Sequence, residues 1–172
     1  QNVGTNKSVT LGTLALADNT ASASNYSLSS ATLNITQRPL NVTATKAYDG
    51  STAVSSGTVT LSNLSGGQTI NTSGSITTTS ANVASYGTSD ISVSSLSLAD
   101  GTGAASNYTL VGGTYSATVT QKVLGLSGSR VYDATTTASP SDLTLTGLVG
   151  SETLTLSGSG TLTSSAVGTG KT

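Results

Sequence analysis

The amino-acid sequence predicts an all-β chain made of tandem modules, and three observations lead to that prediction. Apolar and polar residues alternate in short runs, turn-forming residues separate the runs, and long blocks of sequence recur about 84 residues further along the chain. A density of about seven short strands per repeat is typical of an immunoglobulin-like β-sandwich. We therefore expect tandem immunoglobulin-like β-sandwich modules in an elongated array.

The alternative fold is a β-solenoid, which the tract 65–80 favours because it is rich in Ser, Thr and Gly. Solenoid coils usually repeat about every 20 residues, whereas the period of this chain is about four times longer. The long period favours the sandwich over the solenoid.

Two recurring motifs define the repeat. The first reads LALADNTASASNYSL at 14–28 and LSLADGTGAASNYTL at 96–110. The second reads RPLNVTATKAYDG at 38–50 and KVLGLSGSRVYDA at 122–134. Because the second motif opens a repeat and the first lies near its end, the chain is expected to be a segment of a longer array that is cut through two modules. The expected divisions are the second half of a module at 1–36, a complete module at 37–120 and the first half of a module at 121–172.

Alternation with a period of two gives the strands of the complete module, since successive side chains of a strand point to opposite faces of the sheet. Glycine-containing dipeptides give the turns, because glycine can take the positive φ of a tight turn. No helical stripe of useful length competes. In chain order, the strands are expected at 40–45, 59–61, 91–93, 96–98, 108–110 and 115–119, and the turns at 49–50, 66–67, 100–101 and 112–113.

Composition excludes several classes of function. Charged residues make up 8% of the chain and the net charge is -1, so the chain lacks a basic field that could hold nucleic acid. His and Cys are absent, which removes histidine acid–base catalysis, thiolate chemistry and cysteine-type zinc sites. No apolar run approaches the ~18 residues of a membrane span. We therefore expect no enzyme, no cofactor, no metal, no nucleic-acid partner and no membrane insertion.

The residues that recur are explained by structural roles. Asp49 and Gly50 begin a turn, while the ring of Tyr48 can lie on a thin core. The SNY motif can close an Asx turn before the next strand begins. Since Phe and Trp are absent, the tyrosines are the largest core side chains available, and their burial is expected. The structural motif residues are Tyr26, Tyr48, Asp49, Gly50, Tyr108, Tyr132 and Asp133, with Ala134 in place of the second motif's glycine.

At these residues the chain resembles the YDG and MBG-type tandem repeat modules of large bacterial adhesins, many of them secreted by the two-partner route and similar to filamentous haemagglutinin. The resemblance rests on RPLNVTATKAYDGSTAV at 38–54, LADGTGAASNYTL at 98–110 and TYSATVTQKVL at 114–124. It implies an extracellular location at the bacterial cell surface or matrix. It also implies neighbouring repeat modules, of the same or an adjacent chain, as partners.

Three functions are compatible with these observations. The resemblance implies a structural stalk, spacer or filament building block of an adhesin or surface fibre. The alternative is a glycan-binding module of a biofilm matrix adhesin, with surface or matrix polysaccharide as partner, which predicts exposed tyrosines on one face. The third is self-association, in which a half module of one copy is completed by a half module of the next.

The joins at 35–40 and 119–124 read as continuous strands, which predicts a stiff rod.

Overall fold

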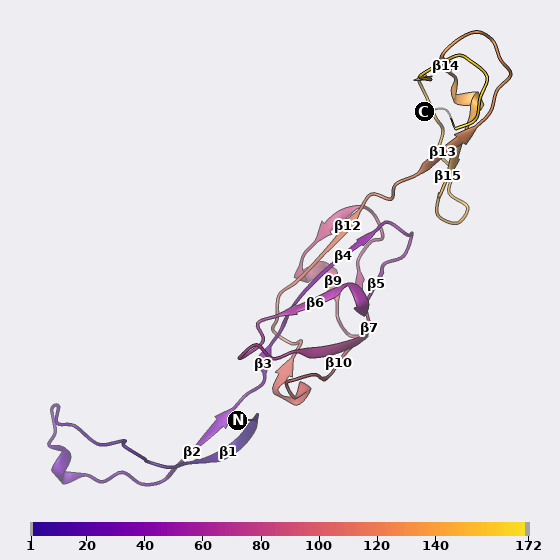
Figure 1. Cartoon of the computed structure of the whole chain (residues 1–172). Coiled ribbons are helices and arrows are strands. Elements are labelled where there is room, and N and C mark those ends of the chain that lie inside the picture. The colour runs from indigo at the N-terminus through magenta and orange to yellow at the C-terminus, as the bar shows by residue number, and fades with distance from the viewer. Residues whose placement is uncertain (1, 171–172) are drawn as a thin grey trace.

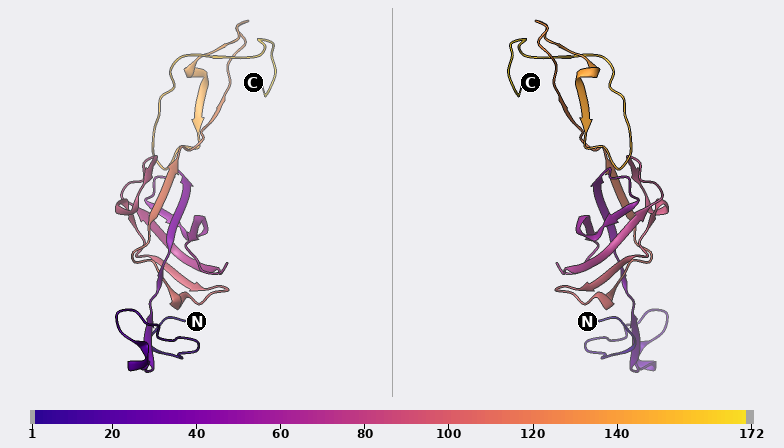
Figure 2. Two further views of the ribbon diagram at one scale, coloured as in Figure 1. Left: turned by 90° about the vertical axis from the view of Figure 1, so that its left-hand side faces the viewer. Right: turned by 90° about the vertical axis from the view of Figure 1, so that its right-hand side faces the viewer.

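The chain is elongated, with three parts in a row (Figures 1 and 2). The computed structural model describes residues 2–170. A central unit, defined here as residues 37–120, lies between an N-terminal part, residues 2–36, and a C-terminal part, residues 121–170. Within the described residues, no helix is long and apolar enough to span a membrane.

The regular structure consists of β-strands and three-residue 3₁₀ helices, which confirms the prediction of an all-β chain. The N-terminal part contains β1 (Gly4–Val9), η1 (Ala23–Asn25) and β2 (Ala31–Ile35). The central unit contains β3 (Arg38–Pro39), β4 (Asn41–Ala47), β5 (Ala53–Ser55), η2 (Ser56–Thr58), β6 (Val59–Ser62), β7 (Ile70–Thr78), β8 (Ala84–Tyr86), η3 (Thr88–Asp90), β9 (Ile91–Ser92), β10 (Leu96–Asp100), η4 (Ala105–Asn107), β11 (Tyr108–Thr109) and β12 (Tyr115–Thr120). The C-terminal part contains β13 (Gly125–Gly128), β14 (Thr137–Ala138), η5 (Pro140–Asp142), β15 (Leu143–Thr146) and β16 (Gly160–Thr161).

The first long strand and the last strand of the central unit lie side by side and run in the same direction. They belong to a sheet with the order β6-β4-β12-β8. Strand β12 pairs with β4 in parallel, from Tyr115 opposite Val42 to Thr120 opposite Ala47, while β6 and β8 are antiparallel to their neighbours. Because β4 and β12 are parallel, the chain comes into the unit at one end and leaves it at the other. This topology places the three parts in a row.

The second sheet of the central unit is built around β7. Its order is β10-β7-β5, with β9 also pairing with β7, and all these pairs are antiparallel. Strand β7, the longest strand in the described residues, does not follow from the alternation of the sequence. Most of its residues are Ser, Thr, Asn and Gly, so it carries little apolar alternation, and it is ordered because strands on both sides satisfy its backbone groups.

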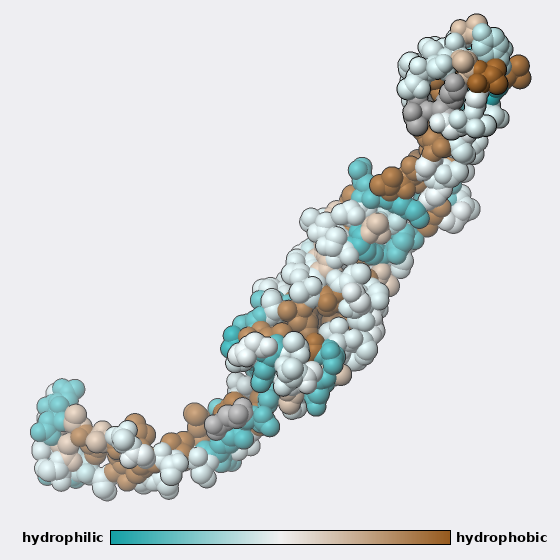
Figure 3. Space-filling view, in the orientation of Figure 1, coloured by the Kyte–Doolittle hydropathy of each residue, from teal (hydrophilic) through white to brown (hydrophobic). Residues whose placement is uncertain are grey.

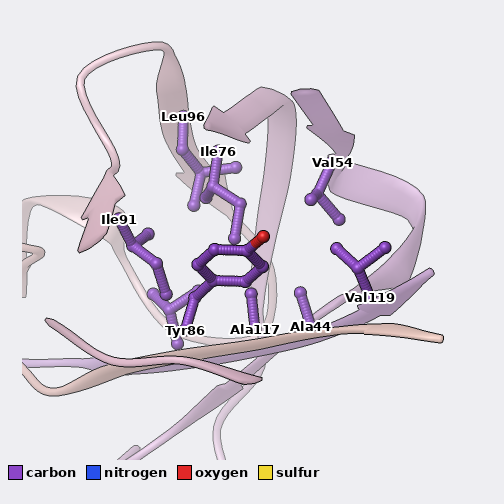
Figure 4. Packing of buried hydrophobic residues seen from close by; sticks show 9 residues of the cluster. Ala44, Val54, Ile76, Tyr86, Ile91, Leu96, Ala117 and Val119 are labelled. Atoms are coloured by element: carbon purple, nitrogen blue, oxygen red, sulfur yellow. The ribbon is translucent and has the colours of Figure 1, made fainter. Parts of the chain in front are cut away.

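The core lies between these two sheets (Figure 4). The ring of Tyr86 lies at its centre, and its hydroxyl donates a hydrogen bond to the Asn82 carbonyl at 2.7 Å. Thr78 is the one buried polar side chain among the described residues, and its hydroxyl donates to carbonyl oxygens, so its burial is compensated. Each fully buried aliphatic side chain contributes about 1.5–3 kcal/mol. The buried cluster is Val42, Ala44, Val54, Ile76, Tyr86, Ile91, Leu96, Ala117 and Val119.

The parts on either side of the central unit are less complete. The N-terminal part has the single antiparallel pair β1-β2, and the C-terminal part has the pairs β13-β15 and β14-β16. Among the described residues outside the central unit, Ala138 is the one buried hydrophobic residue. Two sheets facing each other across a core therefore occur in the central unit and in neither of the other two parts that the structure describes.

Candidate functional site

The Tyr-Asp-Gly turn of the central unit is organised by the ammonium group of Lys46. Its Nζ donates to the Asp49 carboxylate at 2.6 Å, to the Ser51 carbonyl at 2.5 Å and to the Ala53 carbonyl at 2.9 Å. The Asp49 carboxylate in turn accepts a hydrogen bond from the Ser51 backbone N–H at 2.9 Å. One cation thus holds the turn after β4 against the start of β5, which explains why a basic residue recurs before Tyr-Asp.

The same arrangement occurs one repeat later. The guanidinium of Arg130 lies 3.1 Å from the Asp133 carboxylate and donates to the carbonyls of Thr135 and Thr137. The Asp133 carboxylate accepts from the backbone N–H and the hydroxyl of Thr135, both at 2.9 Å. The four positions correspond one to one with those of the first turn. The repeat therefore preserves a hydrogen-bonded turn.

Both aspartates have pKa values below the ordinary range, with a different largest cause in each turn. The hydrogen bond from Lys46 and then that from the Ser51 backbone lower the pKa of Asp49. Hydrogen bonds from the backbone and hydroxyl of Thr135, followed by the charge of the nearby guanidinium, lower the pKa of Asp133. Each interaction favours the ionised carboxylate.

The residue after each aspartate takes a left-handed backbone conformation. Gly50 has φ of +76° and Ala134 has φ of +61°. This conformation suits glycine, whereas a residue with a Cβ is strained in it. The departure from glycine at the second turn therefore leaves the turn geometry in place at a cost in local strain.

The LAD…SNY motif also forms the same local structure twice. The carboxylate of Asp18 accepts from the Ala23 backbone N–H at 2.6 Å, and that of Asp100 accepts from the Ala105 N–H at 2.7 Å. In each copy a 3₁₀ helix follows and ends at the tyrosine. Each aspartate thus closes the loop that leads into the following 3₁₀ helix, η1 or η4.

The four repeated tyrosines differ in burial, so the expectation that all four are buried is wrong for two of them. Tyr108 is 4% exposed, and its hydroxyl donates to Gln68 Oε1 at 2.6 Å and accepts from the Ser65 backbone N–H at 3.2 Å. Tyr48 is partly buried. Tyr26 and Tyr132 are 65% and 60% exposed, because the parts of the chain that contain them lack the opposing sheet.

The turn of the central unit contacts the C-terminal part. The Tyr48 hydroxyl donates a hydrogen bond to the Glu152 carboxylate. A Cβ built on Gly50 would lie 3.0 Å from Val149 Cγ1, so a side chain of the C-terminal part covers this glycine. We call the resulting 430 Å³ hollow the joint cleft. The joint cleft is lined by Tyr48, Val83, Gln121, Lys122, Val123, Leu124, Leu148, Val149, Glu152 and Leu154.

We call the contact between the Tyr-Asp-Gly turn and the C-terminal part the joint, and this contact changes the acidity of Tyr48. The hydrogen bond with Glu152 raises the pKa of Tyr48 above its ordinary value, and partial loss of water and the carboxylate charge act in the same direction. The neutral phenol is the form that can donate to the carboxylate. Folding and joint formation therefore both favour the protonated hydroxyl.

The acceptor at the joint, Glu152, is not among the residues predicted from the sequence, although the repeat contains a signal for it. Aligning TLSNLSGGQTI at 60–70 with TLTGLVGSETL at 144–154 places Gln68 and Glu152 at the same position. Gln68 accepts from Tyr108 of its own unit, whereas Glu152 accepts from Tyr48 of the preceding unit. This loop position therefore meets a tyrosine hydroxyl in both copies.

Among the cations of residues 2–170, three are bonded within the chain. Arg38 donates to the carbonyl and the side-chain oxygen of Asn63, at 2.6 and 2.7 Å, while Lys46 and Arg130 hold the two turns. Within residues 2–170, no three His, Cys, Asp or Glu side chains gather closely enough to hold a metal ion.

Comparison with known proteins gives one family. The YDG domain matches the chain twice, at residues 34–119 and at residues 115–172. No curated protein and no solved structure matches. The two matches lie on either side of the joint and overlap at residues 115–119, within β12.

The match corrects several expectations from the sequence. What matches is the YDG domain, and SRA-YDG domains are known as methylcytosine-binding modules of eukaryotes and phages. The assignment to repeat modules of bacterial adhesins is therefore withdrawn, together with the surface-fibre and stalk function and the alternative glycan-binding role in a biofilm. The exclusion of nucleic acid as a partner is wrong as well, because YDG domains are known to bind methylated DNA. The matches span most of the sequence, and the chain belongs to the YDG domain family.

Proposed function

We propose that this chain is a protein-binding module whose partner is another YDG domain, held at the joint between successive domains. The observation that carries the proposal is the hydrogen bond from the Tyr48 hydroxyl to Glu152, made between the two stretches that match the family. A hydrogen bond to an ionised acceptor is stronger than one between neutral groups. Packing of Val149 over Gly50 adds apolar contact beside it.

The topology supports the same proposal. Because β4 and β12 are parallel, the Tyr-Asp-Gly turn after β4 lies at the end of the central unit from which β12 leaves. The first strand of the next domain, β13, begins within a few residues of the end of β12, so the connection between the two domains is short. The 147–152 loop of that next domain lies beside the Tyr-Asp-Gly turn. A short connection costs little conformational entropy when the two surfaces meet.

We also propose that a complete YDG domain in this chain is an immunoglobulin-like sandwich of residues 37–120, with half domains at 1–36 and 121–172. The two facing sheets of the central unit, whose pairs are mainly antiparallel, support this proposal over the solenoid. An extracellular location and the absence of enzymatic activity stay predictions.

Binding of methylated DNA is a second candidate, and the family name is the observation that favours it. Charge opposes it: the net charge is -1, and Arg38, Lys46 and Arg130 are bonded within the chain. Affinity for DNA rests largely on cations that neutralise phosphates. Gel retardation of methylated and unmethylated duplex DNA at low salt tests this candidate. Retardation of the methylated duplex alone would replace the joint proposal with this one.

The joint is tested by amide hydrogen exchange in the C-terminal part. Tyr48→Phe and Glu152→Gln each remove or weaken the bond at the joint, so both should speed exchange in β13 and β15, with little change in the buried strands of the central unit. The matched control is Tyr132→Phe, at the equivalent tyrosine, which is 60% exposed and should change nothing. Equal exchange in all four proteins would refute the proposed role of the joint.

A further inference from the structure

The loop that reaches the Tyr-Asp-Gly turn carries both of its contact residues on one tight turn. The Glu152 backbone N–H donates to the Val149 carbonyl at 3.0 Å, and the side chains of these two residues meet Gly50 and Tyr48. The contact between the two parts of the chain is narrow, with apolar surface beside polar surface (Figure 3). Because one turn presents both residues, a displacement of Val149 also moves the Glu152 carboxylate away from the Tyr48 hydroxyl.

Gly50 leaves room for Val149 and for nothing larger than a hydrogen of its own. A Cβ built on Gly50 would lie 3.0 Å from Val149 Cγ1, whereas carbon atoms in favourable contact are about 3.5–4.0 Å apart. Valine is branched at Cβ, so its χ1 is restricted and the side chain cannot turn aside cheaply. A side chain at residue 50 would therefore push the whole loop away from the turn.

The same loop occurs one repeat earlier with a smaller residue at the contact position. The Gln68 backbone N–H donates to the Ser65 carbonyl at 3.0 Å, which is the hydrogen bond that closes the later loop. The glycines that follow Ser65 and Val149 both have positive φ, +59° at Gly66 and +55° at Gly150. The backbone of the loop is thus preserved, while the residue that would face a turn changes from serine to valine.

The turn also occurs twice, and its contact residue changes in size as well. Ala134 stands where the first turn has Gly50, with φ of +61° against +76°, and the hydrogen bonds of the two aspartates correspond. The second turn therefore presents a Cβ at the place where the first presents none. Such a turn has room for a serine in the loop that it meets, and a valine there would overlap with it.

We propose that the residue after Tyr-Asp selects which YDG domain is held at the joint, by the size of the loop residue that it accepts. A turn with glycine, as at Gly50, accepts a loop with valine, and a turn with alanine, as at Ala134, accepts a loop with serine. The inference rests on the proposed function, because it names the specificity of the same joint. Steric exclusion of the wrong partner is a general source of specificity between similar domains.

The hydrogen bond at the joint does not make this selection. Both turns contain a tyrosine, Tyr48 and Tyr132, and both loops contain a side-chain oxygen that accepts from a tyrosine hydroxyl, at Gln68 and Glu152. Any turn could thus bond to any loop on these grounds alone. The size of the residues at positions 50 and 149 is what differs between the copies.

The test is a double-mutant cycle in the full chain, with Gly50→Ala, Val149→Ser and the two changes combined. Amide hydrogen exchange in β13 and β15 is measured in all four proteins. Gly50→Ala alone should speed this exchange about fivefold or more, which is the lower end of what overpacking costs. In the Val149→Ser background the same change should speed it less than about twofold, and backbone strain at residue 50, which is common to both backgrounds, cancels in the cycle. Ala134 shows that the turn forms with alanine.

Val149→Thr is the matched control, because threonine has the polarity of serine and the branched shape of valine. If size decides, Gly50→Ala should still speed exchange about fivefold in the Val149→Thr background. Relief by threonine equal to the relief by serine would overturn the proposal, because polarity would then explain it. Equal effects of Gly50→Ala in the unmodified and Val149→Ser backgrounds would overturn it as well.

Tyr48→Phe, measured in the same series, separates this inference from the proposed function. Faster exchange in Tyr48→Phe together with an additive cycle would leave the joint in place and refute selection by size. Unchanged exchange in Tyr48→Phe together with a non-additive cycle would refute the role of the hydrogen bond and support the steric pairing. Unchanged exchange in Tyr48→Phe and Gly50→Ala alike would refute both.

Discussion

Replacing Lys46 by Met tests whether one ammonium group holds the Tyr-Asp-Gly turn. The Lys46 side chain is 9% exposed and donates to Asp49, Ser51 and Ala53. Methionine keeps most of the apolar stem and removes the charge and all three donors. The change therefore isolates the hydrogen bonds from the packing of the side chain.

The expected loss follows from the exposure of the acceptors. Hydrogen bonds to a charged group contribute about 1.5–3 kcal/mol, and an ion pair with a half-exposed partner contributes about 0–1 kcal/mol. Asp49 is 53% exposed, so water can replace part of what its carboxylate loses. We expect the central unit to lose about 2 kcal/mol of its free energy of unfolding, which corresponds to a fall in melting temperature of roughly 8–16 °C for a domain of this size.

The assay is native-state amide exchange at Val42, Val54 and Ile76, which lie in the core of the central unit. A loss of about 2 kcal/mol speeds exchange through global opening roughly 30-fold. Arg130→Met, at the equivalent position of the C-terminal part, is the matched control and should leave these amides unchanged. A change of less than threefold in Lys46→Met, or equal changes in the two variants, would refute the reasoning.

Two further predictions concern the turns. Gly50→Ala should destabilise the central unit by about 1 kcal/mol, because the residue has φ of +76° and its new Cβ would lie against Val149. Ala134→Gly should stabilise the C-terminal part by a similar amount, because glycine relieves the strain of the left-handed conformation there. Urea unfolding of both variants checks that the two changes in the free energy of unfolding have opposite signs. The pKa of Asp49 is lowered in the folded state, so its contribution to stability is present above the unfolded value of 3.8 and is lost as the pH falls through the lower folded value. Unfolding measured from neutral to acid pH should show this loss in the unmodified chain and less of it in Asp49→Asn, and parallel curves would contradict the assignment.

Local regularities were predictable from the sequence because they depend on residues close together in the chain. The alternation of Val42 and Ala44 with polar residues gave β4, and the recurrence of Tyr-Asp gave the two turns. Strand β7 was not predictable from alternation, because neighbouring strands stabilise its polar sequence. The parallel pairing of β4 with β12 joins residues more than 70 positions apart, and no local pattern encodes it.

The candidate site was only partly predictable for the same reason. Tyr48 and Asp49 were expected in a turn, but the partner of Tyr48 is Glu152, 104 residues further along. Tyr26 and Tyr132 were expected to be buried, and they are exposed because burial depends on an opposing sheet that their own parts do not contain. A motif thus predicts the local conformation of a residue, whereas its burial depends on the rest of the domain.

Residual dipolar couplings of backbone amides test most directly whether successive YDG domains are held together at the joint. The couplings of residues 37–120 and those of residues 121–170 are each fitted to an alignment tensor in the unmodified chain. A joint fixed by Tyr48, Glu152 and Val149 predicts one tensor, equal in magnitude and orientation for both parts. Two independent tensors, with the smaller one in the C-terminal part, would show that the parts move freely and would contradict the account.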